Sequence, residues 1–377
     1  MKKLNIAILG IRGLPSTYSG YETFVGELAP RLVEQGHAVT IYCRRSLFQE
    51  RPDEYLGMRM KYLPSIEHKF FSTLSHSLFS ITHASFSKFD VILVVNAANG
   101  MFGIVPRLLG RACVLNVDGM EWLRPKWNAV ARWIFRNSAR WGTKFYHAVV
   151  TDAEEMHRLY AREFGIDSTY IAYGANIETA GRPDVPAEYG LRPREYYLIA
   201  SRLVPDNNAD IIVEAFVRSG SDKTLAIAGG ADYKGNKVEK GFLDKLKAMA
   251  GDRVRFLGHV NSAEHIKELH GHCYAYIHGH QFGGINPSLL KALGYGNMIL
   301  ALNTPFNAEV LADGKYGILF EKDAEDLARK IADLDRDPDR AEEFRRKAPG
   351  RIRERFTWER ITKEYEDLFY SLVRPAS

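Results

Sequence analysis

Short apolar runs alternate with longer amphipathic segments along most of this chain. The first run, 4–9, ends at Gly10 and is followed by a helical pattern over 21–35 and a second apolar run, 38–43. A buried strand, a helix and a second buried strand in this order predict a βαβ unit. The alternation continues with predicted strands at 58–63, 90–95, 112–117 and 147–151 and a helix at 73–87. The first half is therefore predicted to form a doubly wound sheet.

A second alternating series begins after residues 179–193, which are rich in glycine, proline and arginine. Strands are predicted at 196–200, 224–228, 253–257, 274–277, 298–302 and 316–320, and residues 324–373 read as helical. Because 377 residues exceed the usual size of one domain, we expect two. These are a Rossmann-like domain at 1–180 and another at 190–355, with a helix at 356–377 that packs back on the first domain.

Two sheets of this kind predict a location for the ligand. In open α/β sheets, ligands bind outside the carboxyl ends of the strands. We therefore expect an α/β fold in which two doubly wound domains face one another across an interdomain cleft.

Composition narrows the class of protein. The chain is 46% hydrophobic and 26% charged with a net charge of +5, which is typical of a globular protein. No apolar run approaches the length of a membrane-spanning helix, and the apolar run behind Lys2 and Lys3 lacks a cleavage site and reads as a strand. The three cysteines are far apart, which favours a reducing compartment without disulfides. A cytoplasmic location is the resulting expectation.

The most informative stretch for function is 278–297, HGHQFGGINPSLLKALGYGN. Gly283 and Gly284 allow the backbone to come close to a ligand. Asn286 is a predicted N-cap, with Pro287 at the first helical position and Ser288 behind it. A helix N-terminus reached through glycines binds anions, because it carries free N–H groups and the positive end of the helix dipole. We expect the diphosphate of a nucleotide sugar to lie here.

The glycine-rich loop after the first strand, GIRGLPSTYSG, does not match the dinucleotide fingerprint GxGxxG. Its length suggests a loop that reaches over a cleft. An ordinary strand-to-helix connection explains this segment equally well.

Metal-binding patterns are weak. Five of the 12 histidines fall between His265 and His280, but no cysteine or carboxylate completes a zinc spacing. We expect His278 or His280 to hydrogen-bond a sugar or phosphate instead. The aspartates at 333–339 precede a proline at a helix end and are interpreted as solvated surface. No metal site is predicted.

A basic and aromatic segment lies at 122–146. It holds four of the five tryptophans, and Arg132, Arg136 and Arg140 recur at a spacing that places them on one helix face. Lys126 belongs to the same charged group. Basic faces with aromatic rims suit an anionic membrane surface, whereas no nucleic-acid-binding module accompanies these charges. A core-packing helix with a solvated basic face is the alternative.

The chain resembles a retaining glycosyltransferase of family 4, with the GT-B fold. The resemblance rests on GIRGLPSTYSGYETF, NVDGMEW, YGAN, SRLVPDNN and the stretch 278–297, and it runs nearly end to end. It is most similar to a bacterial branch that includes rhamnosyltransferases of surface-polysaccharide assembly. This resemblance implies a metal-independent hexosyltransferase without a cofactor. The first domain would bind a glycan or polyprenyl-diphosphate-linked acceptor, and the second a nucleotide sugar such as dTDP-rhamnose. The enzyme would be peripheral on the inner face of the cell membrane.

The resemblance also assigns donor-binding residues. Arg202 would contact the donor diphosphate and stabilise it as it leaves, and Asn207 stands where the family commonly has a lysine. Backbone N–H groups of Gly283 and Gly284 would face phosphate or sugar. Gly13 and Gly20 would let the first loop close over the donor. The remaining donor-binding positions are His280, Asn286, Ser288 and Lys291.

The resemblance also assigns acceptor-binding and catalytic residues in the first domain. Retaining transfer in this fold relies mainly on positioning and charge stabilisation. Asp118 lies where many relatives place a histidine, and it could accept the acceptor's proton or orient a sugar hydroxyl. Its alternative role is to cap the loop at 119–122. Glu22, Glu121 and Trp122 are the expected acceptor contacts.

Lys291 departs from the family pattern. Relatives place a glutamate there that accepts hydrogen bonds from the ribose, whereas lysine only donates. Lys291 could face a phosphate, could mark another donor or weak catalysis, or could reflect damaged activity. Two further functions therefore stay open, namely a nucleotide-sugar 2-epimerase and a non-catalytic nucleotide-sugar-binding protein.

Overall fold

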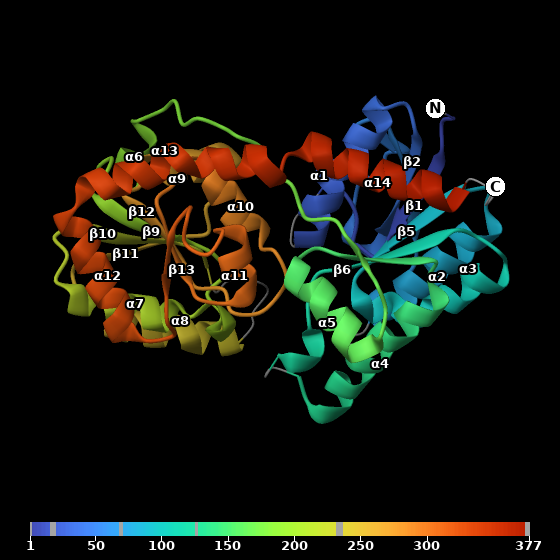
Figure 1. Ribbon diagram of the computed structural model, residues 1–377, viewed down its shortest axis with the longest axis horizontal. Helices are drawn as coiled ribbons and strands as arrows, with labels where there is room; N and C mark the ends of the chain where they lie inside the picture. The colour runs from blue at the N-terminus through green and yellow to red at the C-terminus, as the bar shows by residue number, and fades with distance from the viewer. Residues whose placement is uncertain (1, 16–19, 68–70, 125–126, 231–236, 374–377) are drawn as a thin grey trace. The chain divides into compact units, whose positions relative to one another are not determined.

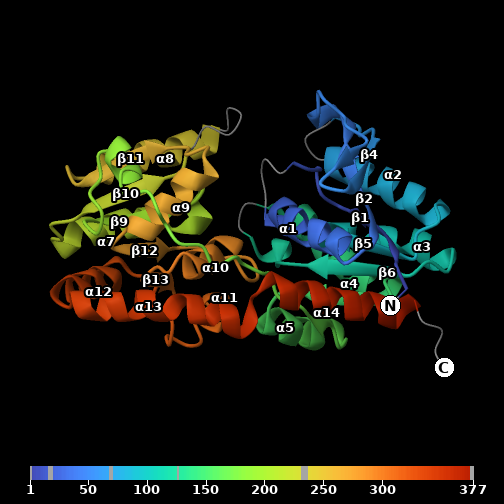
Figure 2. The ribbon, with the colours of Figure 1, turned by 90° about the horizontal axis from the view of Figure 1, so that it is seen from above.

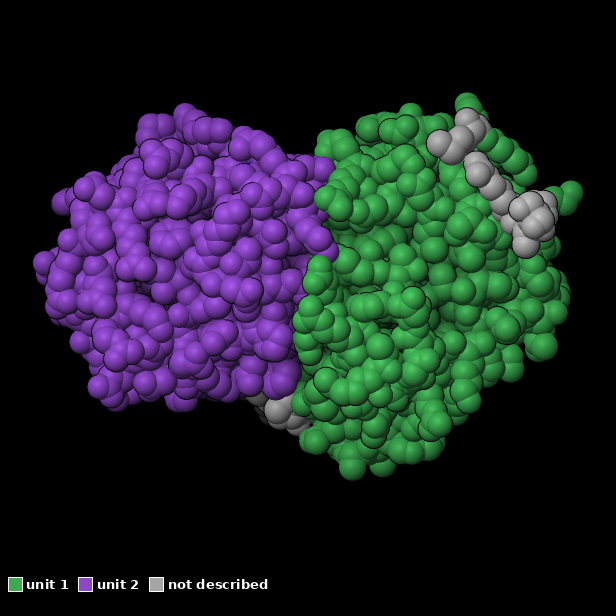
Figure 3. Space-filling view, in the orientation of Figure 1, with its two compact units in different colours: residues 1–174, 358–377 green, residues 175–357 purple. Residues whose placement is uncertain are grey.

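The computed structural model describes residues 2–15, 20–67, 71–124, 127–230 and 237–373 (Figure 1). The chain divides into two compact units. Unit 1 comprises Met1–Gly174 and Trp358–Ser377, and unit 2 comprises Ala175–Thr357 (Figure 3). The segment at 175–193 thus belongs to unit 2, and the C-terminal helix belongs to unit 1.

Unit 1 is built on an eight-stranded sheet in the order β3-β4-β2-β1-β5-β6-β7-β8. Among the strands of the described residues, only β3 and β4 pair in antiparallel orientation. The central strands are almost wholly apolar and buried, as expected for a parallel sheet covered on both faces. The strands are β1 (Asn5–Leu9), β2 (Ala38–Arg44), β3 (Glu54–Tyr55), β4 (Met58–Leu63), β5 (Val91–Val95), β6 (Cys113–Val117), β7 (Ala148–Thr151) and β8 (Thr169–Tyr170).

Helices cover both faces of this sheet. Helices α1 and α14 pack against each other on one face, through the rings of Phe24, Trp358 and Tyr365. Figure 1 shows α2 and α3 on the opposite face. The helices are α1 (Gly20–Glu34), α2 (Ser72–Phe86), α3 (Ile104–Leu108), α4 (Ala129–Phe145), α5 (Glu154–Phe164) and α14 (Trp358–Val373). The 3₁₀ segments are η1 (Arg45–Leu47), η2 (Ala97–Gly103) and η3 (Glu121–Leu123).

Unit 2 holds a six-stranded parallel sheet in the order β11-β10-β9-β12-β13-β14. The order reverses beside β9, which is the switch point of a doubly wound sheet. The strands are β9 (Tyr196–Ala200), β10 (Thr224–Ala228), β11 (Val254–Gly258), β12 (Ala275–His278), β13 (Ile299–Leu302) and β14 (Ile318–Phe320).

The helices of unit 2 form two layers. Figure 1 shows α7, α8 and α12 on one face of the sheet and α9 and α10 on the other. Apolar side chains of α7 and α12 form one core with the strands. The helices are α6 (Val185–Glu188), α7 (Ala209–Ser219), α8 (Lys237–Met249), α9 (Ala263–His272), α10 (Pro287–Gly294), α11 (Pro305–Val310), α12 (Ala324–Arg336) and α13 (Pro338–Arg355), and η4 spans Pro205–Asn207.

The predicted elements are confirmed with small shifts at their ends. The strand predicted from residue 90 begins at Val91, and just before it the Asp90 carboxylate accepts a hydrogen bond from the Asn5 backbone N–H at 2.7 Å. The two-residue strands β3 and β8 were not predicted, since they are too short to show a period. Among the described helices, none is long and apolar enough to cross a membrane.

Candidate functional site

The carboxyl edge of the unit 2 sheet brings the predicted donor-binding segments together. Two close backbone approaches hold these loops in place. A Cβ on Gly229, after β10, would lie 1.9 Å from the Ser201 carbonyl oxygen, and one on Gly279, after β12, would lie 2.3 Å from the Asn207 carbonyl oxygen. Both positions therefore require glycine. The loops after β9, β10 and β12 are packed backbone to backbone at this edge.

Two buried asparagines shape the loop after β9. The Asn207 amide donates to the Arg202 carbonyl oxygen at 2.8 Å. Asn208 has a positive φ of 52° and its amide donates to the Gly279 carbonyl oxygen at 2.8 Å. Both side chains are thus used by the protein's own backbone. The Arg202 side chain is exposed at this edge.

The predicted start of α10 is confirmed. Asn286 is the N-cap, and its side-chain oxygen accepts from the Ser288 backbone N–H at 2.9 Å and from the Ser288 hydroxyl at 2.7 Å. Pro287 is the first helical residue. Gly283 has a φ of 120°, a conformation that favours glycine. The chain therefore reaches the helix through a turn that only a flexible residue accommodates easily.

Two stacked histidines leave β12 toward this edge. The His278 and His280 ring centroids lie 4.4 Å apart, and Tyr276 Oη lies 3.1 Å from His278 Nδ1. Burial lowers the pKa of His278 well below its ordinary value, with the neighbouring histidines adding to the effect. At neutral pH His278 is uncharged. His278 is also fully buried, so it adds no positive charge at this edge.

Lys291 lies on α10 with its side chain exposed. The positive charge of Lys291 acts electrostatically on the buried His270 on α9. Burial lowers the pKa of His270 to about 4, a hydrogen bond with Asn297 opposes this shift, and Lys291 adds to it.

Unit 1 gathers acidic and phenolic groups at the carboxyl edge of its own sheet. Asp118 follows β6 and is half-buried. Burial raises the pKa of Asp118 to about 6. The charge of Glu121 adds to this rise, whereas a hydrogen bond from the Tyr21 phenol and the charge of Arg124 oppose it. Such a carboxyl group exchanges protons readily near neutral pH, as a general base must.

A second carboxylate, Asp152, follows the adjacent strand β7 and is fully buried. It was not singled out from the sequence, because an aspartate before a helix most often serves as a cap. Together with burial and the charge of Asp118, it raises the pKa values of Tyr160 and Tyr173. Those phenols therefore stay protonated and can donate hydrogen bonds.

The predicted acceptor contacts have structural partners of their own. Glu22 is buried in α1 and accepts a hydrogen bond from the Arg12 backbone N–H at 2.9 Å, which anchors the first loop. Glu121 accepts from the Trp127 indole N–H at 2.8 Å and pairs with Arg124 at 3.1 Å. Trp122 is buried, with its ring against Phe164. These contacts hold the first loop and the segment around Glu121 in place.

The first loop is described only in part. Gly13 has a φ of 135°, and a Cβ there would lie 2.7 Å from the Cys43 sulfur and from the Phe48 ring. Gly20 begins α1. Residues 16–19, on which the prediction of a closing loop depends, lie outside the described part of the chain.

The aspartates at the end of α12 are more structural than predicted. Asp335 accepts hydrogen bonds from the Tyr197 hydroxyl at 2.7 Å and from Lys223 at 3.0 Å, so its interpretation as solvated surface is wrong. Asp337 caps α13. Within the described residues, no group of three or more histidine, cysteine, aspartate or glutamate side chains could hold a metal ion.

Comparison with known proteins identifies the family. Residues 183–351 match the family model "Glycosyl transferases group 1", and residues 19–176 match "Glycosyl transferase 4-like domain". This chain is a GT-B glycosyltransferase family 4-like protein. An uncharacterized glycosyltransferase of Methanocaldococcus jannaschii is 31% identical over 137 residues, and the match spans 35% of each chain.

Solved structures support the fold of this family 4-like protein. Sucrose-phosphate synthase from Thermosynechococcus elongatus superimposes with a TM-score of 0.83 at 17% identity, covering 98% of this chain and 99% of that one. HepE from Anabaena, in complex with UDP and glucose, gives a TM-score of 0.77 at 16% identity, with coverage of 98% and 100%. Starch synthase IV from Arabidopsis thaliana, bound to ADP and acarbose, gives 0.73 at 14% identity, with coverage of 99% and 100%. The predicted α/β class and GT-B fold are confirmed.

In this family 4-like chain, α4 carries the predicted basic and aromatic surface. Its small residues Ser138, Ala139 and Gly142 are buried, while Trp133 is 63% exposed and Val130 is 65% exposed. Arg132, Arg136 and Arg140 are also exposed. Lys126, which was grouped with these charges, lies outside the described residues.

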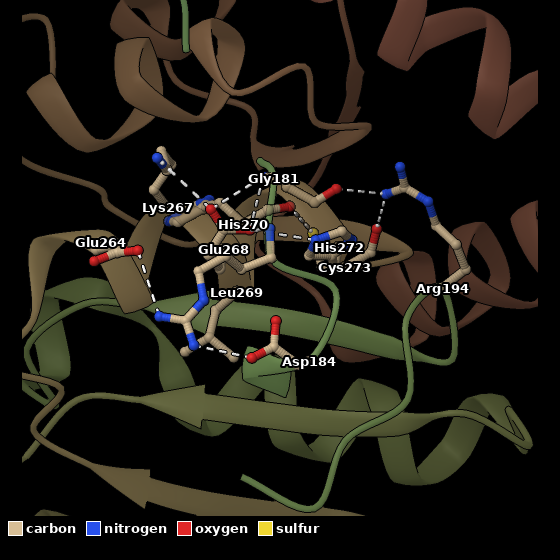
Figure 4. A network of polar contacts seen from close by, with 12 residues as sticks. Gly181, Asp184, Arg194, Glu264, Lys267, Glu268, Leu269, His270, His272 and Cys273 are labelled. Carbon is tan, nitrogen blue, oxygen red and sulfur yellow. Dashed lines mark hydrogen bonds and ion pairs between the residues drawn. The ribbon is translucent and has the colours of Figure 1, made fainter. Parts of the chain in front are cut away.

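A buried network in unit 2 was missed by sequence reasoning. Glu268 on α9 accepts hydrogen bonds from the backbone N–H groups of Gly181 and Arg182, the shortest at 2.8 Å, and pairs with His272 at 3.3 Å (Figure 4). Arg194 donates to the Gly271 and Cys273 carbonyl oxygens. This network fastens the segment at the start of unit 2 to α9. A lone glutamate on an amphipathic helix carries no signal of such a role.

Proposed function

We propose that this chain is a retaining, metal-independent hexosyltransferase that moves a sugar from a nucleotide diphosphate sugar to a glycan or lipid-linked acceptor. The observation that carries the proposal is the carboxyl edge of unit 2. There an exposed arginine, Arg202, stands on a loop held rigid by Asn207 and Asn208. The same edge presents the start of α10. The resemblance of the sequence motifs favours dTDP-rhamnose as donor and surface-polysaccharide assembly as context.

The donor site follows from the charges and donors at this edge. A guanidinium can bind phosphate oxygens with two parallel hydrogen bonds, and the start of α10 offers backbone N–H groups. Gly283 and Gly284 would admit the diphosphate close to the backbone, and His280 would offer a hydrogen bond to sugar or phosphate. Arg202 would then stabilise the diphosphate as it leaves. The solved complexes of similar folds with UDP and ADP support a nucleotide at such a site.

On the acceptor side, Asp118 is the proposed base. Its raised pKa suits a group that takes a proton from the attacking hydroxyl near neutral pH. Glu22, Glu121 and Trp122 would shape the acceptor-binding loops around it. We also propose that the exposed α4 surface contacts anionic lipid, so that the enzyme meets a membrane-borne acceptor from the cytoplasmic side.

A nucleotide screen tests the donor site. In thermal-shift measurements with UDP, GDP, ADP and dTDP, at least one nucleotide should raise the melting temperature of the wild-type protein. Arg202→Ala should weaken that nucleotide about tenfold or more, since hydrogen bonds to charged groups contribute about 1.5–3 kcal/mol. Arg218→Ala is the matched control, because Arg218 is an exposed arginine paired with Glu214 on α7.

The same preparations separate a transferase from the alternatives. A transferase should hydrolyse the matching sugar nucleotide slowly without acceptor, in the presence of EDTA. Binding without hydrolysis or transfer would favour the non-catalytic reading raised by Lys291. Release of the nucleotide together with an altered free sugar would favour a 2-epimerase. Absence of binding to all four nucleotides would overturn the proposal.

A further inference from the structure

Arg44, the last residue of β2, is a buried arginine with few partners. Only 6% of its surface is exposed. One guanidinium nitrogen donates to the Thr73 hydroxyl at 2.8 Å, and the buried Nε has no hydrogen-bond partner within the described part of the chain. Across the described residues, no carboxylate forms an ion pair with it. Buried charges are normally paired, because removing them from water is costly.

The surroundings of Arg44 increase the free-energy cost of burying its positive charge. The Arg44 backbone N–H donates to the Arg12 carbonyl oxygen at 2.8 Å, which brings the two arginines together. Burial lowers the pKa of Arg44, and the charge of Arg12 lowers it further, while Glu67 and Glu22 act in the opposite direction. Glu22 is already bound to the Arg12 backbone, and exposed Glu67 is held by serine hydroxyls. The carboxylates nearby are therefore committed elsewhere.

The first turn of α2 adds a second feature that favours anions. Thr73, the partner of Arg44, lies in this turn, and the N-cap Phe71 provides no side-chain hydrogen bond to the helix. Figure 2 shows α2 beside β2 and β4. A helix N-terminus attracts anions through its N–H groups and dipole. The buried guanidinium of Arg44 thus lies beside the first turn of α2 in unit 1.

Two neighbouring residues fix this arrangement. His76, one turn further along α2, is buried and hydrogen-bonds the Cys43 backbone. Gly13 allows the first loop to lie against Cys43 in β2 and Phe48 after η1. Arg44 is therefore held by a strand, a helix and a loop, which is the rigidity expected of a binding site rather than of a surface side chain.

We propose that Arg44, with Arg12 and the first turn of α2, forms a phosphate subsite in unit 1 that binds a phosphate or diphosphate ester. The site stands on its own geometry, and its purpose rests on the proposed transferase function. There the ester would be the diphosphate of a polyprenyl-linked acceptor or that of the nucleotide sugar. No sequence motif pointed to Arg44.

The test uses the full chain carrying Arg202→Ala, so that the proposed donor site does not compete. Titration calorimetry with inorganic pyrophosphate compares this parent with versions that also carry Arg44→Met or Arg59→Gln. Arg59 is the matched control, since it is an exposed arginine on the neighbouring strand β4. We expect a salt-sensitive affinity in the parent, a loss of about tenfold or more with Arg44→Met, and a change below about twofold with Arg59→Gln.

Melting temperatures without ligand separate a binding role from a structural one. Replacing a buried charge with an apolar side chain of similar length should leave the melting temperature unchanged or raise it. An Arg44→Met protein that melts several degrees lower yet binds pyrophosphate as the parent does would overturn the proposal. So would a parent that does not bind millimolar pyrophosphate.

Two further ligands identify the source of the phosphate. Farnesyl diphosphate should bind the Arg202→Ala parent and weaken with Arg44→Met if the subsite takes the acceptor. UDP should weaken with Arg44→Met alone if the subsite takes the donor. Either result supports the subsite. Absence of binding to all four nucleotides in the wild-type protein, together with pyrophosphate binding that depends on Arg44, would reject the proposed donor site and leave this inference standing.

Discussion

Asp118 and Arg44 lie at the same edge of one sheet, and burial has opposite consequences for them. For the carboxyl group, burial raises the pKa into the range where it can exchange a proton. For the guanidinium, which cannot be deprotonated near neutral pH, burial leaves a charge that needs an anion. The unit 1 edge therefore combines one group suited to proton transfer with another suited to binding.

Asp118→Asn should lower the transfer rate by about 100-fold to 10,000-fold, the usual contribution of a general base. In the wild type, kcat/KM should rise as the pH increases through about 6, because only the deprotonated carboxylate accepts the proton. The amide variant should lose this rise. The measurement is a pH–rate profile with the donor found in the nucleotide screen. A variant that retains the rise would assign the titration to another group.

Single residues also show how far sequence reasoning reaches. The N-cap Asn286 and the helix start at Pro287 were predictable, because the contacts that define them lie within two residues. The bond from Asn208 to Gly279 spans 71 positions, and that from Glu268 to Arg182 spans 86. Such pairs exist only once the sheet has formed, so no local pattern encodes them. For the same reason, no local sequence pattern indicates a role for Arg44.

At the scale of elements, α4 combines exposed apolar side chains with exposed arginines on one helix. Trp133 and Val130 are exposed beside a row of arginines. An exposed tryptophan leaves apolar surface in water unless something covers it. Aromatic side chains and basic residues together are the composition that binds anionic interfaces.

The full chain should float with liposomes that contain anionic lipid and stay behind with neutral ones. Trp133→Ala together with Arg136→Gln should abolish flotation, because each basic residue near an anionic surface contributes about 1 kcal/mol and the indole adds buried area. Arg329→Gln, which alters an exposed arginine in unit 2, is the control. Equal flotation with neutral lipid, or none with either lipid, would remove the membrane contact from the proposed function.

At the scale of the whole molecule, the last helix of the chain, α14, completes unit 1. The C-terminal helix α14 belongs to unit 1, where Phe369 and Tyr365 are fully buried and the Asn116 amide on β6 donates to the Tyr365 hydroxyl at 2.8 Å. The sequence predicts that this helix packs back on the first domain. The periodicity of the sequence predicts this helix. Only its aromatic face indicates that it packs on a part of the chain far away in the sequence.

Phe369→Ala should destabilise unit 1 by about 3–5 kcal/mol, since it opens a cavity in a closed core. Lys363→Ala, on the exposed side of the same helix, should have little effect. Hydrogen exchange resolves the two units, and faster exchange should appear in β1, β5 and α1 while the strands of unit 2 keep their protection. Uniform loss of protection in both units would mean that they unfold as one.

The late position of α14 has a consequence for synthesis on the ribosome. All described strands of both units precede Trp358 in the sequence, so they are synthesised before α14. Through that interval, the apolar side of α1 around Phe24 lacks the aromatic rings that later cover it. Unit 2 is continuous in sequence and can fold before unit 1 is complete. Until α14 packs, the nascent first unit exposes an apolar surface on α1 that chaperones can bind.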